Sequence, residues 1–373
     1  MLMRRSAMDP DLVKPRAAHG RLPLSAKTLP RTPAKARFSA GDIAALFSSW
    51  EAARGILLGV SGGPDSVALM LLAAEWARAR AAPPALFVAT VDHGLRKESR
   101  GEAEMVADWA AALSLPHAIL VWEGVKPRSR IQERAREARY ALLSEHAARI
   151  GADHIMTAHH ADDQAETILF RLLRGSGISG LSGMGSSSKR NGIILARPLL
   201  SCAKAELVAL CERRAQPFVR DPSNDDPAYA RTRTRRLSVL LAEEGLDREA
   251  LLRLGRRAAR ADAALDKHAR GVALKIKAQR EPGRFEANIA ALINEPEEIV
   301  LRVLADELKL ISGAKPLRFE RLEALAQGLG RALRGGTAYK ATLGGAALRL
   351  QSDHIIVIAR EGARRRGREA RLS

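Results

Sequence analysis

Short apolar runs alternate with helical stretches through the first two thirds of the chain. Apolar runs of strand length lie at 56–60, 86–91, 118–122, 154–158 and 192–196. Helical composition and periodicity occupy 67–76, 102–113, 131–150 and 203–216, with a short helix near 44–47 and Ser201 as the expected N-cap of the last one. Strands that alternate with helices in this way predict an α/β fold, an open parallel sheet with helices on both faces.

The pattern changes beyond residue 246, where helices dominate. Helical stretches are expected at 249–270, 289–293, 296–310 and 318–329, and a short hairpin at 346–350 and 354–358 follows them. A smaller, mainly helical second domain is therefore predicted. The expected organisation is a disordered basic arm at 1–40, the α/β domain at 41–245, the helical domain at 246–358 and a disordered basic tail at 359–373.

Positive charge dominates the composition. The 373 residues include 61 Lys and Arg against 42 Asp and Glu, which gives a formal net charge of +19. A chain this basic usually has a polyanionic partner, and nucleic acid is the first candidate. The alternative is a solvated surface that is simply rich in arginine, so charge alone does not decide between the two.

Cysteine usage and hydropathy indicate the compartment. Only two cysteines occur, Cys202 and Cys211, on what is predicted to be one helix, and their spacing suits neither a disulfide nor a C-x-x-C metal or redox pair. No apolar run approaches the roughly 18 to 20 residues of a membrane span, and the N-terminus lacks the apolar core of a signal peptide. We therefore expect a protein of the reducing cytoplasm without membrane contact.

The most informative stretch follows the first apolar run. Its residues are Ser61, Gly62, Gly63, Pro64, Asp65 and Ser66. A strand, a glycine turn and a helix beginning near Val67 form a cradle in which backbone N–H groups and the positive helix end face an anion. Polyphosphate is the natural ligand, and Asp65 suggests a Mg²⁺ ion between the carboxylate and the phosphates. An ordinary glycine turn that caps a helix is the alternative.

Two further sets of polar residues follow later strands. Asp92 and His93 end the second apolar run, and His159, Asp163 and Glu166 follow the fourth. In an open parallel sheet both sets lie at the same edge as the glycine turn, so we expect Asp92, His93 and His159 in the nucleotide site. Asp163 and Glu166 share one helix face and can hold Mg²⁺ or a cationic amine. Acidic residues that only complement the helix dipole, or a zinc site, are the alternatives, although no H-E-x-x-H spacing occurs.

Two loop regions carry glycine or arginine. Arg171 and Arg174 precede a glycine-rich turn at 175–185, and a Ser/Lys/Arg/Asn loop follows. We expect either a mobile loop that closes over substrate or an uninvolved surface loop. Turn residues at 221–226 precede a run of arginines at 229–236, which can contact phosphate or lie on a solvated helix start.

Taken in order, these motifs resemble those of the tRNA(Ile)-lysidine synthetase family, within the PP-loop ATP pyrophosphatase superfamily. Ser-Gly-Gly-Pro-Asp-Ser at 61–66 identifies the superfamily alone. The narrower signature adds Val-Asp-His-Gly-Leu-Arg at 91–96, His-His-Ala-Asp-Asp-Gln-Ala-Glu-Thr at 159–167, Arg-Leu-Leu-Arg-Gly-Ser-Gly at 171–177, Arg-Pro-Leu-Leu at 197–200, and Asp-Pro-Ser-Asn at 221–224 before Tyr-Ala-Arg at 229–231. The resemblance is strong over 50–240 and weaker to 358, where the helical part is similar to the family's tRNA-binding domain.

The resemblance implies an ATP-dependent ligase that acts on the wobble cytidine of the CAU anticodon in a minor tRNA(Ile). In that family carbon 2 of the cytosine ring is adenylated, pyrophosphate leaves, and the side-chain amine of free L-lysine displaces AMP to form lysidine. By resemblance, the glycine turn holds ATP, Asp65 its Mg²⁺, and Asp163 with Glu166 positions the lysine amine or takes its proton. Arg139 and Arg231 are candidates to hold ATP or the tRNA near the reacting base.

The chain departs from the family pattern in two places. Thr232 follows Arg231 where the family commonly has asparagine, which puts any role of that amide side chain in doubt. Many relatives also carry a further C-terminal domain that helps to hold the tRNA, and we expect it to be absent after residue 358. We expect the basic arms to replace part of its phosphate contacts.

Three rival functions fit parts of the sequence. A tRNA thiolase shares the glycine turn but usually needs cysteines for sulfur transfer, and Cys202 and Cys211 lack the paired spacing. A small-molecule amide synthetase explains the turn but not the positive charge. A catalytically silent RNA-binding protein explains the charge but not the intact acidic set of Asp163 and Glu166. No stable protein partner is expected.

Overall fold

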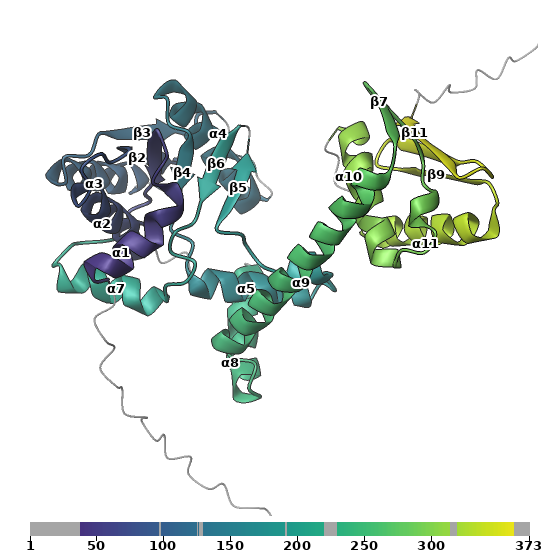
Figure 1. The fold of residues 1–373 in the computed structure, drawn as a ribbon. Helices are drawn as coiled ribbons and strands as arrows, with labels where there is room; N and C mark the ends of the chain where they lie inside the picture. Colours follow the sequence, from purple (N-terminus) through teal and green to yellow (C-terminus); the bar gives the residue numbers. More distant parts are fainter. Residues whose placement is uncertain are drawn as a thin grey trace, which may run out of the picture.

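The chain folds into two units that a long helix joins (Figure 1). The structure, a computed structural model, describes residues 38–361 except 97, 125, 127–129, 191, 220–229 and 314–318. Most of the predicted arm and tail therefore lies outside the described residues. Within the described part, Phe38 is already buried, and the Ser39 side chain caps the first helix together with Asp42.

A six-stranded sheet forms the first unit, in the order β3-β2-β1-β4-β6-β5. Its strands are β1 (Gly55–Gly59), β2 (Ala85–Asp92), β3 (His117–Val121), β4 (His154–Met156), β5 (Ser187–Arg190) and β6 (Ile193–Ala196). All pairs are parallel except β5 with β6, which form an antiparallel hairpin at one edge. The open parallel sheet is confirmed, but the segment predicted as a loop before residue 192 forms an edge strand. All four residues of β5 are exposed and none is apolar, so no hydrophobic pattern marks it.

Helices cover both faces of this sheet. They are α1 (Ala40–Phe47), a 3₁₀ turn (Ser48–Trp50), α2 (Pro64–Arg78), α3 (Ser99–Ala112), α4 (Ile131–Arg149), α5 (Ala161–Leu172), α6 (Ile178–Leu181) and α7 (Lys204–Arg213). Alternate residues of β1 face opposite layers. Ile56 and Leu58 pack in one apolar cluster with α1, α2, α3 and α7, whereas Leu57 packs in another with α4. The predicted α/β architecture is therefore confirmed.

Three local predictions are wrong in detail. Helix α2 begins at Pro64 and not three residues later, because proline fits the first helical position, where its missing N–H and fixed φ cost nothing. Helix α7 begins after Ala203, whose backbone N–H donates to the Glu206 carboxylate at 2.7 Å, so Ser201 is not the N-cap. Cys202 precedes α7, so the two cysteines do not share one helix.

The second unit combines helices with a five-stranded antiparallel sheet, in the order β7-β8-β11-β10-β9. Its elements are β7 (Ala278–Glu281), β8 (Arg284–Asn288), a 3₁₀ turn (Ala290–Leu292), α10 (Glu297–Ser312), α11 (Phe319–Gly335), β9 (Tyr339–Leu343), β10 (Ala346–Leu350) and β11 (Ile355–Arg360). The two helices and the terminal hairpin are confirmed, and the sheet is larger than expected. Strands β7, β8 and β9 carry many polar, outward-facing residues, so their apolar pattern is weak.

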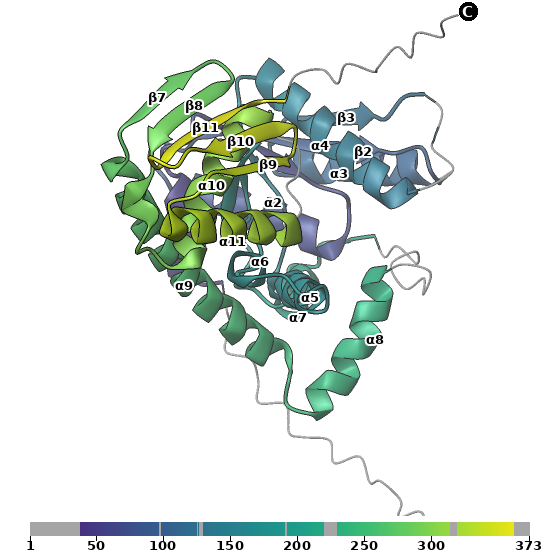
Figure 2. The same cartoon turned by 90° about the vertical axis from the view of Figure 1, so that its right-hand side faces the viewer.

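Helix α9 (Arg248–Lys275) runs from one unit into the other, and α8 (Ala230–Glu243) precedes it (Figures 1 and 2). The first half of α9 packs on α5 and α6, and its second half packs on α10. Arg302 of α10 lies 2.8 Å from the Asp262 carboxylate of α9 and donates to Ser179 Oγ of α6 at 3.1 Å. One guanidinium therefore connects three helices where the units meet. Although α9 has 28 residues, neither it nor any other described helix is long and apolar enough to span a membrane.

Candidate active site

The glycine turn lies at the carboxyl end of β1, where the strand order reverses. Strand β1 pairs with β2 on one side and with β4 on the other, and the chain proceeds outward in both directions from this point. Open α/β sheets bind ligands in the crevice at such a switch point. The turn, the end of β2 and the start of α5 after β4 therefore meet at one edge of the sheet.

The local geometry opens the turn to an anion. Gly62 has a φ of +86, which favours glycine, and a Cβ there would lie 3.3 Å from Val219 Cγ2. Ser66 Oγ donates to the Gly63 carbonyl at 2.9 Å and accepts from the Ser61 N–H at 3.1 Å. These bonds fix the turn at the start of α2, where first-turn N–H groups have no partner within the helix. An anion placed here meets those N–H groups and the positive helix end.

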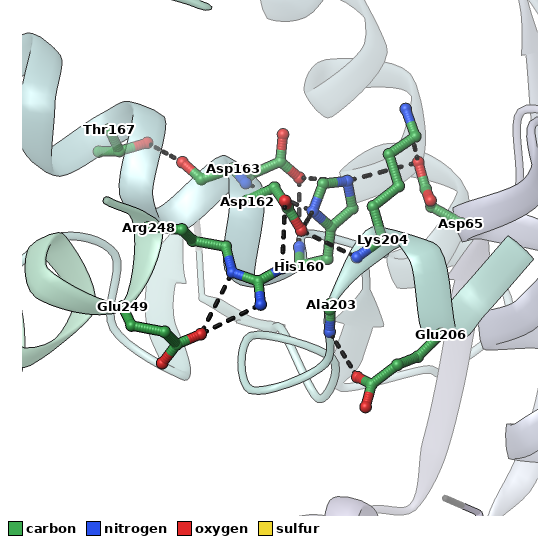
Figure 3. Close-up of polar contacts among 10 residues, drawn as sticks. All are labelled: Asp65, His160, Asp162, Asp163, Thr167, Ala203, Lys204, Glu206, Arg248 and Glu249. Carbon is green, nitrogen blue, oxygen red and sulfur yellow. Dashed lines mark hydrogen bonds and ion pairs between the residues drawn. The ribbon is translucent and has the colours of Figure 1, made fainter. Parts of the chain in front are cut away.

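A buried histidine joins the turn to α5 (Figure 3). His160 caps α5, since its Nδ1 accepts from the Asp163 N–H at 3.3 Å and its own N–H donates to the Asp163 carboxylate at 3.2 Å. His160 Nε2 lies 3.5 Å from Asp65 Oδ2 and 3.4 Å from Asp163 Oδ2. The imidazole therefore stands between the carboxylate predicted to hold Mg²⁺ and a carboxylate predicted to hold the amine.

The surrounding aspartates raise the pKa of His160. Burial is the largest single influence and lowers this pKa, but the hydrogen bond to Asp65 and the charges of Asp163, Asp65 and Asp162 together outweigh it. Carboxylates this close favour the charged form of a histidine, so the direction of the shift is upward. Lys204, at the start of α7, adds a cation, with its Nζ 4.0 Å from Asp65 Oδ2.

Asp65 keeps one oxygen for another ligand. Its Oδ1 atom is buried and has no hydrogen-bond partner among the described residues. The same part of the chain contains no cluster of three or more His, Cys, Asp or Glu that could enclose a metal. A carboxylate oxygen in this position fits Mg²⁺, which proteins usually bind through one or two carboxylates, with water and substrate phosphates at the remaining positions.

The start of α5 brings both predicted carboxylates to this edge. Asp163 and Glu166 are half-buried and three residues apart, and Thr167 Oγ1 donates to the Asp163 carbonyl at 2.8 Å. The Nδ1 atom of His159 lies 2.9 Å from Thr157 Oγ1. Burial, against the opposing charge of Asp163, lowers the pKa of His159 to about 3, so this ring is neutral at pH 7. At least one of the two carboxylates, that of Asp163, therefore lies near a neutral imidazole.

Asp92 and His93 lie at the end of β2, but Asp92 is engaged locally. Its Oδ1 accepts from Ser99 Oγ at 2.6 Å and from the Gly94 N–H at 2.9 Å, and the bond from Ser99 above all lowers its pKa. His93 stands edge-on to Trp122, and burial lowers its pKa. Asp92 thus shapes the turn after β2, and contact of either residue with a nucleotide stays a prediction.

The two predicted arginines differ in how much of them is described. Arg139 lies on α4 with its guanidinium carbon 5.4 Å from the centre of the Tyr140 ring. Its positive charge contributes to the lowered pKa values of His93 and His159, so it lies near both rings. Arg231 belongs to α8, but its side chain lies outside the described residues, as does the predicted turn at 221–226.

Three residues of this network were not predicted, namely His160, Lys204 and Arg248. The Lys204 N–H donates to Asp162 Oδ2 at 2.8 Å, and Arg248 Nη1 lies 3.4 Å from Asp162 Oδ1 (Figure 3). The three-residue spacing from His160 to Asp163 is that of a capping box, which is a local signal for His160. Lys204 and Arg248 begin two later helices, so nothing near them in the sequence indicates their partner.

Comparison with known proteins supplies the family. Residues 37–241 match the PP-loop domain. The chain is 46% identical to a tRNA(Ile)-lysidine synthase of Rhodopseudomonas palustris over 328 residues, which cover 86% of this chain and 94% of the relative. It is 45% identical to a tRNA(Ile)-lysidine synthase of Bradyrhizobium sp. over 345 residues, with coverages of 88% and 96%. The chain belongs to the tRNA(Ile)-lysidine synthase family. A third such synthase, from Methylobacterium sp., is 47% identical over 324 residues, with coverages of 85% and 92%.

The cysteines fit a lysidine synthase better than a thiolase. Cys202 and Cys211 are both buried and neither forms a disulfide, and Cys211 Sγ lies 3.5 Å from the Pro64 carbonyl. Burial raises the pKa of Cys211 to about 11, so its thiol stays protonated at pH 7. Sulfur transfer needs reactive thiolates. The rival thiolase function therefore finds no support in either cysteine.

The glycine-rich segment of this lysidine synthase family member is anchored. Arg171 Nη1 donates to the carbonyls of Gly180 and Gly183 at 2.8 Å each. The Gln164 side chain donates to the Met184 carbonyl at 2.9 Å and accepts from the Met184 N–H at 2.7 Å. The segment also contains α6, which packs on α9. These contacts favour a connector between α5 and α9 over a mobile loop that closes on substrate.

Proposed function

We propose that this chain is an ATP-dependent ligase that forms lysidine at the wobble cytidine of the CAU anticodon in tRNA(Ile). Its identity to the synthases extends over nearly the whole of each relative. The observation that carries the proposal is the position of His160 between Asp65 and Asp163. A single side chain, that of His160, therefore separates the phosphate cradle at Asp65 from Asp163, a carboxylate that can accept a proton.

ATP binds with its polyphosphate over the turn at 61–66. Gly62 and Gly63 let the backbone approach the phosphates, the hydroxyls of Ser61 and Ser66 lie beside them, and the start of α2 favours negative charge. Asp65 would hold Mg²⁺ with its carboxylate, whose buried Oδ1 has no hydrogen-bond partner among the described residues, and the ion would neutralise phosphate charge.

The first step joins the nucleotide to the base. The oxygen on carbon 2 of cytosine attacks the α-phosphorus of ATP, a new P–O bond forms, and the bond to the β-phosphate breaks as pyrophosphate leaves. Charge develops on the leaving group, where the N–H groups of α2 stabilise it. Arg139 and Arg231 are proposed to hold the nucleotide or the RNA at the same place.

The second step uses the acidic start of α5. Asp163 and Glu166 bind the side-chain ammonium of free L-lysine, and one of them accepts its proton, because a protonated amine is not a nucleophile. The nitrogen attacks carbon 2, the C–N bond forms, and the bond from carbon 2 to oxygen breaks as AMP leaves with that oxygen. His160 keeps Asp163 oriented through the two capping bonds.

The proposal also covers tRNA binding, protein partners and location in the cell. The second unit, which we propose to begin near residue 246, holds the tRNA, and the net charge of +19 favours binding of the polyanion. The reaction requires no stable protein partner. We place the protein in the cytoplasm, together with its tRNA, ATP and lysine.

The test is a reaction of the purified protein with ATP, Mg²⁺, labelled lysine and an unmodified tRNA(Ile) with the CAU anticodon, followed by mass analysis of the digested nucleosides. The same tRNA with uridine at the wobble position is the matched control. We expect lysine on cytidine, with AMP and pyrophosphate released. Pyrophosphate without lysine incorporation would indicate another nucleophile, and no ATP turnover would favour a silent RNA-binding protein.

A further inference from the structure

Arginine side chains gather around one buried tyrosine. Tyr140 of α4 is 2% exposed, and the guanidinium carbons of Arg136, Arg139 and Arg190 lie 5.1, 5.4 and 4.9 Å from its ring centre. Such contacts orient guanidinium groups on an aromatic face. Arg197, just after β6, is buried near the same ring, and burial with the charge of Arg136 lowers its pKa. Cations from α4, β5 and the end of β6 therefore converge.

Three of these cations lack the carboxylates that usually accompany buried arginine. In the part of the chain that the structure describes, no Asp or Glu forms an ion pair with Arg136, Arg190 or Arg197. Arg197 donates instead to two neutral oxygens, at 2.9 and 3.2 Å. Two buried atoms here, Tyr140 Oη and Arg197 Nε, have no hydrogen-bond partner among the described residues. Unbalanced positive charge and unpaired donors cost stability, and an anion would offset both costs.

The cluster lies beside the proposed reaction centre. The charge of Asp163 raises the pKa of His159 and the charges of Arg136 and Arg197 lower it, so His159 lies near both the acidic start of α5 and the arginines. Helix α4, which carries the tyrosine, covers the opposite face of the sheet from α2. Arg197 follows the carboxyl end of β6, which is parallel to β4 and β1, so it lies at the same edge of the sheet as the polyphosphate cradle. Arg136 is half-buried and Arg190 is exposed, so a ligand can reach both.

We propose that Arg136, Arg190 and Arg197, arranged around Tyr140, bind a phosphodiester of the tRNA anticodon loop next to the reacting base. A planar guanidinium matches the oxygens of a phosphate in pairs, which suits arginine better than lysine. An anticodon loop is single-stranded, so its phosphates and its unpaired bases can contact different parts of the protein. The identity of the RNA rests on the proposed function. A phosphate of ATP is the other source of the same chemistry.

Two matched pairs of variants separate this site from general surface charge. Arg136→Gln and Arg134→Gln each remove one positive charge from α4, but Arg134 is exposed and paired with Glu137 at 3.1 Å. Arg190→Gln and Lys189→Gln do the same at neighbouring positions of β5, which face opposite ways. Binding of an unmodified CAU anticodon stem-loop RNA is titrated at several salt concentrations, and binding of Mg²⁺-ATP is measured on the same proteins.

We expect Arg136→Gln and Arg190→Gln to weaken RNA binding severalfold. Each should also flatten the log-log salt dependence by about 0.7, the value for one phosphate contact of a single strand. The controls should keep the wild-type slope, and ATP affinity should stay unchanged in all four variants. Lost ATP affinity with an unchanged RNA slope would assign the cluster to an ATP phosphate and overturn the proposal. Equal effects in the control variants would also overturn it, since any surface charge would then suffice.

Thermal unfolding without ligand distinguishes binding from structure. Because like charges repel, Arg136→Gln should unfold at or above the temperature of Arg134→Gln. A lower temperature together with an unchanged salt slope would make the cluster a structural stack and refute a phosphate site. Lysidine formation by the wild-type protein reports on the proposed function separately. If the wild type forms none while Arg136→Gln still flattens the slope, the function fails and the phosphate site stands.

Discussion

The two carboxylate oxygens of Asp65 have different surroundings. Oδ2 lies 3.5 Å from His160 Nε2 and 4.0 Å from Lys204 Nζ, whereas Oδ1 is buried and without a partner among the described residues. An oxygen held between two nitrogens fixes the carboxylate in place, and the second oxygen can then accept a metal without rearrangement. The side chain is thus prepared for Mg²⁺ by residues from α5 and α7.

Asp65→Asn tests whether the Asp65 carboxylate holds Mg²⁺. The amide keeps the shape of the side chain but removes the charge that a hard cation requires. We expect Mg²⁺-dependent ATP binding to weaken about tenfold or more. Isothermal titration with Mg²⁺-ATP measures the effect, and Glu75→Gln, on the same helix but paired with Arg214, serves as the control. Wild-type affinity in the Asp65→Asn protein would show that another group holds the ion.

Site residues that belong to a sequence motif could be predicted from the sequence. The side chains that contact them in the fold could not. Asp65, Asp163 and Glu166 follow from their motifs, and each lies at the predicted edge of the sheet. His159 and His160 are adjacent, and which ring turns toward Asp65 depends on where α5 begins. Capping bonds within the folded chain fix that start, so His159 was predicted as a site residue and His160 was not.

At the scale of elements, helix starts position most of the proposed chemistry. Helix α2 presents its first turn beside the glycine turn, α5 presents Asp163, and α7 presents Lys204. Each start has a local cause: Pro64 for α2, the His160 cap for α5 and the Glu206 carboxylate for α7. A helix N-terminus attracts anions, so the start of α2 suits a substrate rich in phosphate, whereas the carboxylates at the start of α5 suit a cationic amine.

The glycine turn provides the first prediction at this scale. Gly62→Ala places a side chain at a φ of +86, and its Cβ would press on Val219 at 3.3 Å. We expect a cost of about 1 to 2 kcal/mol in unfolding free energy, and weaker ATP binding because the turn must shift. Gly101→Ala is the control, since its Cβ meets open space in α3 and should stabilise by up to about 1 kcal/mol. Denaturant unfolding and ATP titration of both variants decide whether the strain lies at the turn.

The junction of β1 with β4 provides a pH-dependent prediction. Burial raises the pKa of Asp153, but the hydrogen bonds from His154 and from the N–H groups of Gly55 and Arg54 lower it by more. The net result is a pKa of about 2. The ionised form therefore stabilises the fold above the unfolded value near 4, and this stability disappears as the pH falls toward 2. Asp153→Asn should cost about 2 kcal/mol at pH 7 and about half of that at pH 3. Urea unfolding at both pH values measures the difference. An equal cost at both pH values would show that the ionised Asp153 carboxylate does not stabilise the fold.

Strand prediction succeeded in the buried parallel sheet and failed for strands with solvent-exposed residues. The five parallel strands are short apolar runs, and their places were predicted to within two residues. Strand β5 and strands β7, β8 and β9 contain charged or polar residues because one or both faces meet solvent. A hydrophobic pattern identifies a strand only when another layer of the protein packs on it. The exposed strands are defined by hydrogen bonding to neighbouring strands, which no local pattern indicates.

At the scale of the whole molecule, α9 connects the reaction edge with the second unit. Its first residue, Arg248, binds Asp162 next to His160, and its middle binds Arg302 of α10 through Asp262. One rigid helix thus runs from the nucleotide edge to the unit proposed to hold the tRNA (Figure 1). This arrangement could not be predicted from the sequence, because it depends on contacts between segments far apart in the chain.

The basic arm gives a prediction for the complete chain. Deleting residues 1–37 leaves Phe38 in the core and the Ser39 cap of α1 intact. We expect weaker tRNA binding and a log-log salt slope flatter by about 0.9 for each lost duplex contact, with unchanged ATP affinity. A full-length protein whose arm carries Gln in place of Lys and Arg is the control for length. An unchanged slope in the deletion would exclude the arm from phosphate contact.

The measurement that tests the central claim most directly follows both products in one reaction. Wild-type, Asp65→Asn, Asp163→Asn and Glu166→Gln proteins are mixed with labelled ATP, labelled lysine and the CAU tRNA. Pyrophosphate release and lysine incorporation are then timed together. We expect Asp65→Asn to slow both, and the α5 variants to release pyrophosphate while lysine incorporation falls by about 10² to 10⁴. Equal losses of both products in Asp163→Asn and Glu166→Gln would contradict the account, because these carboxylates would then act in adenylation and not on the amine.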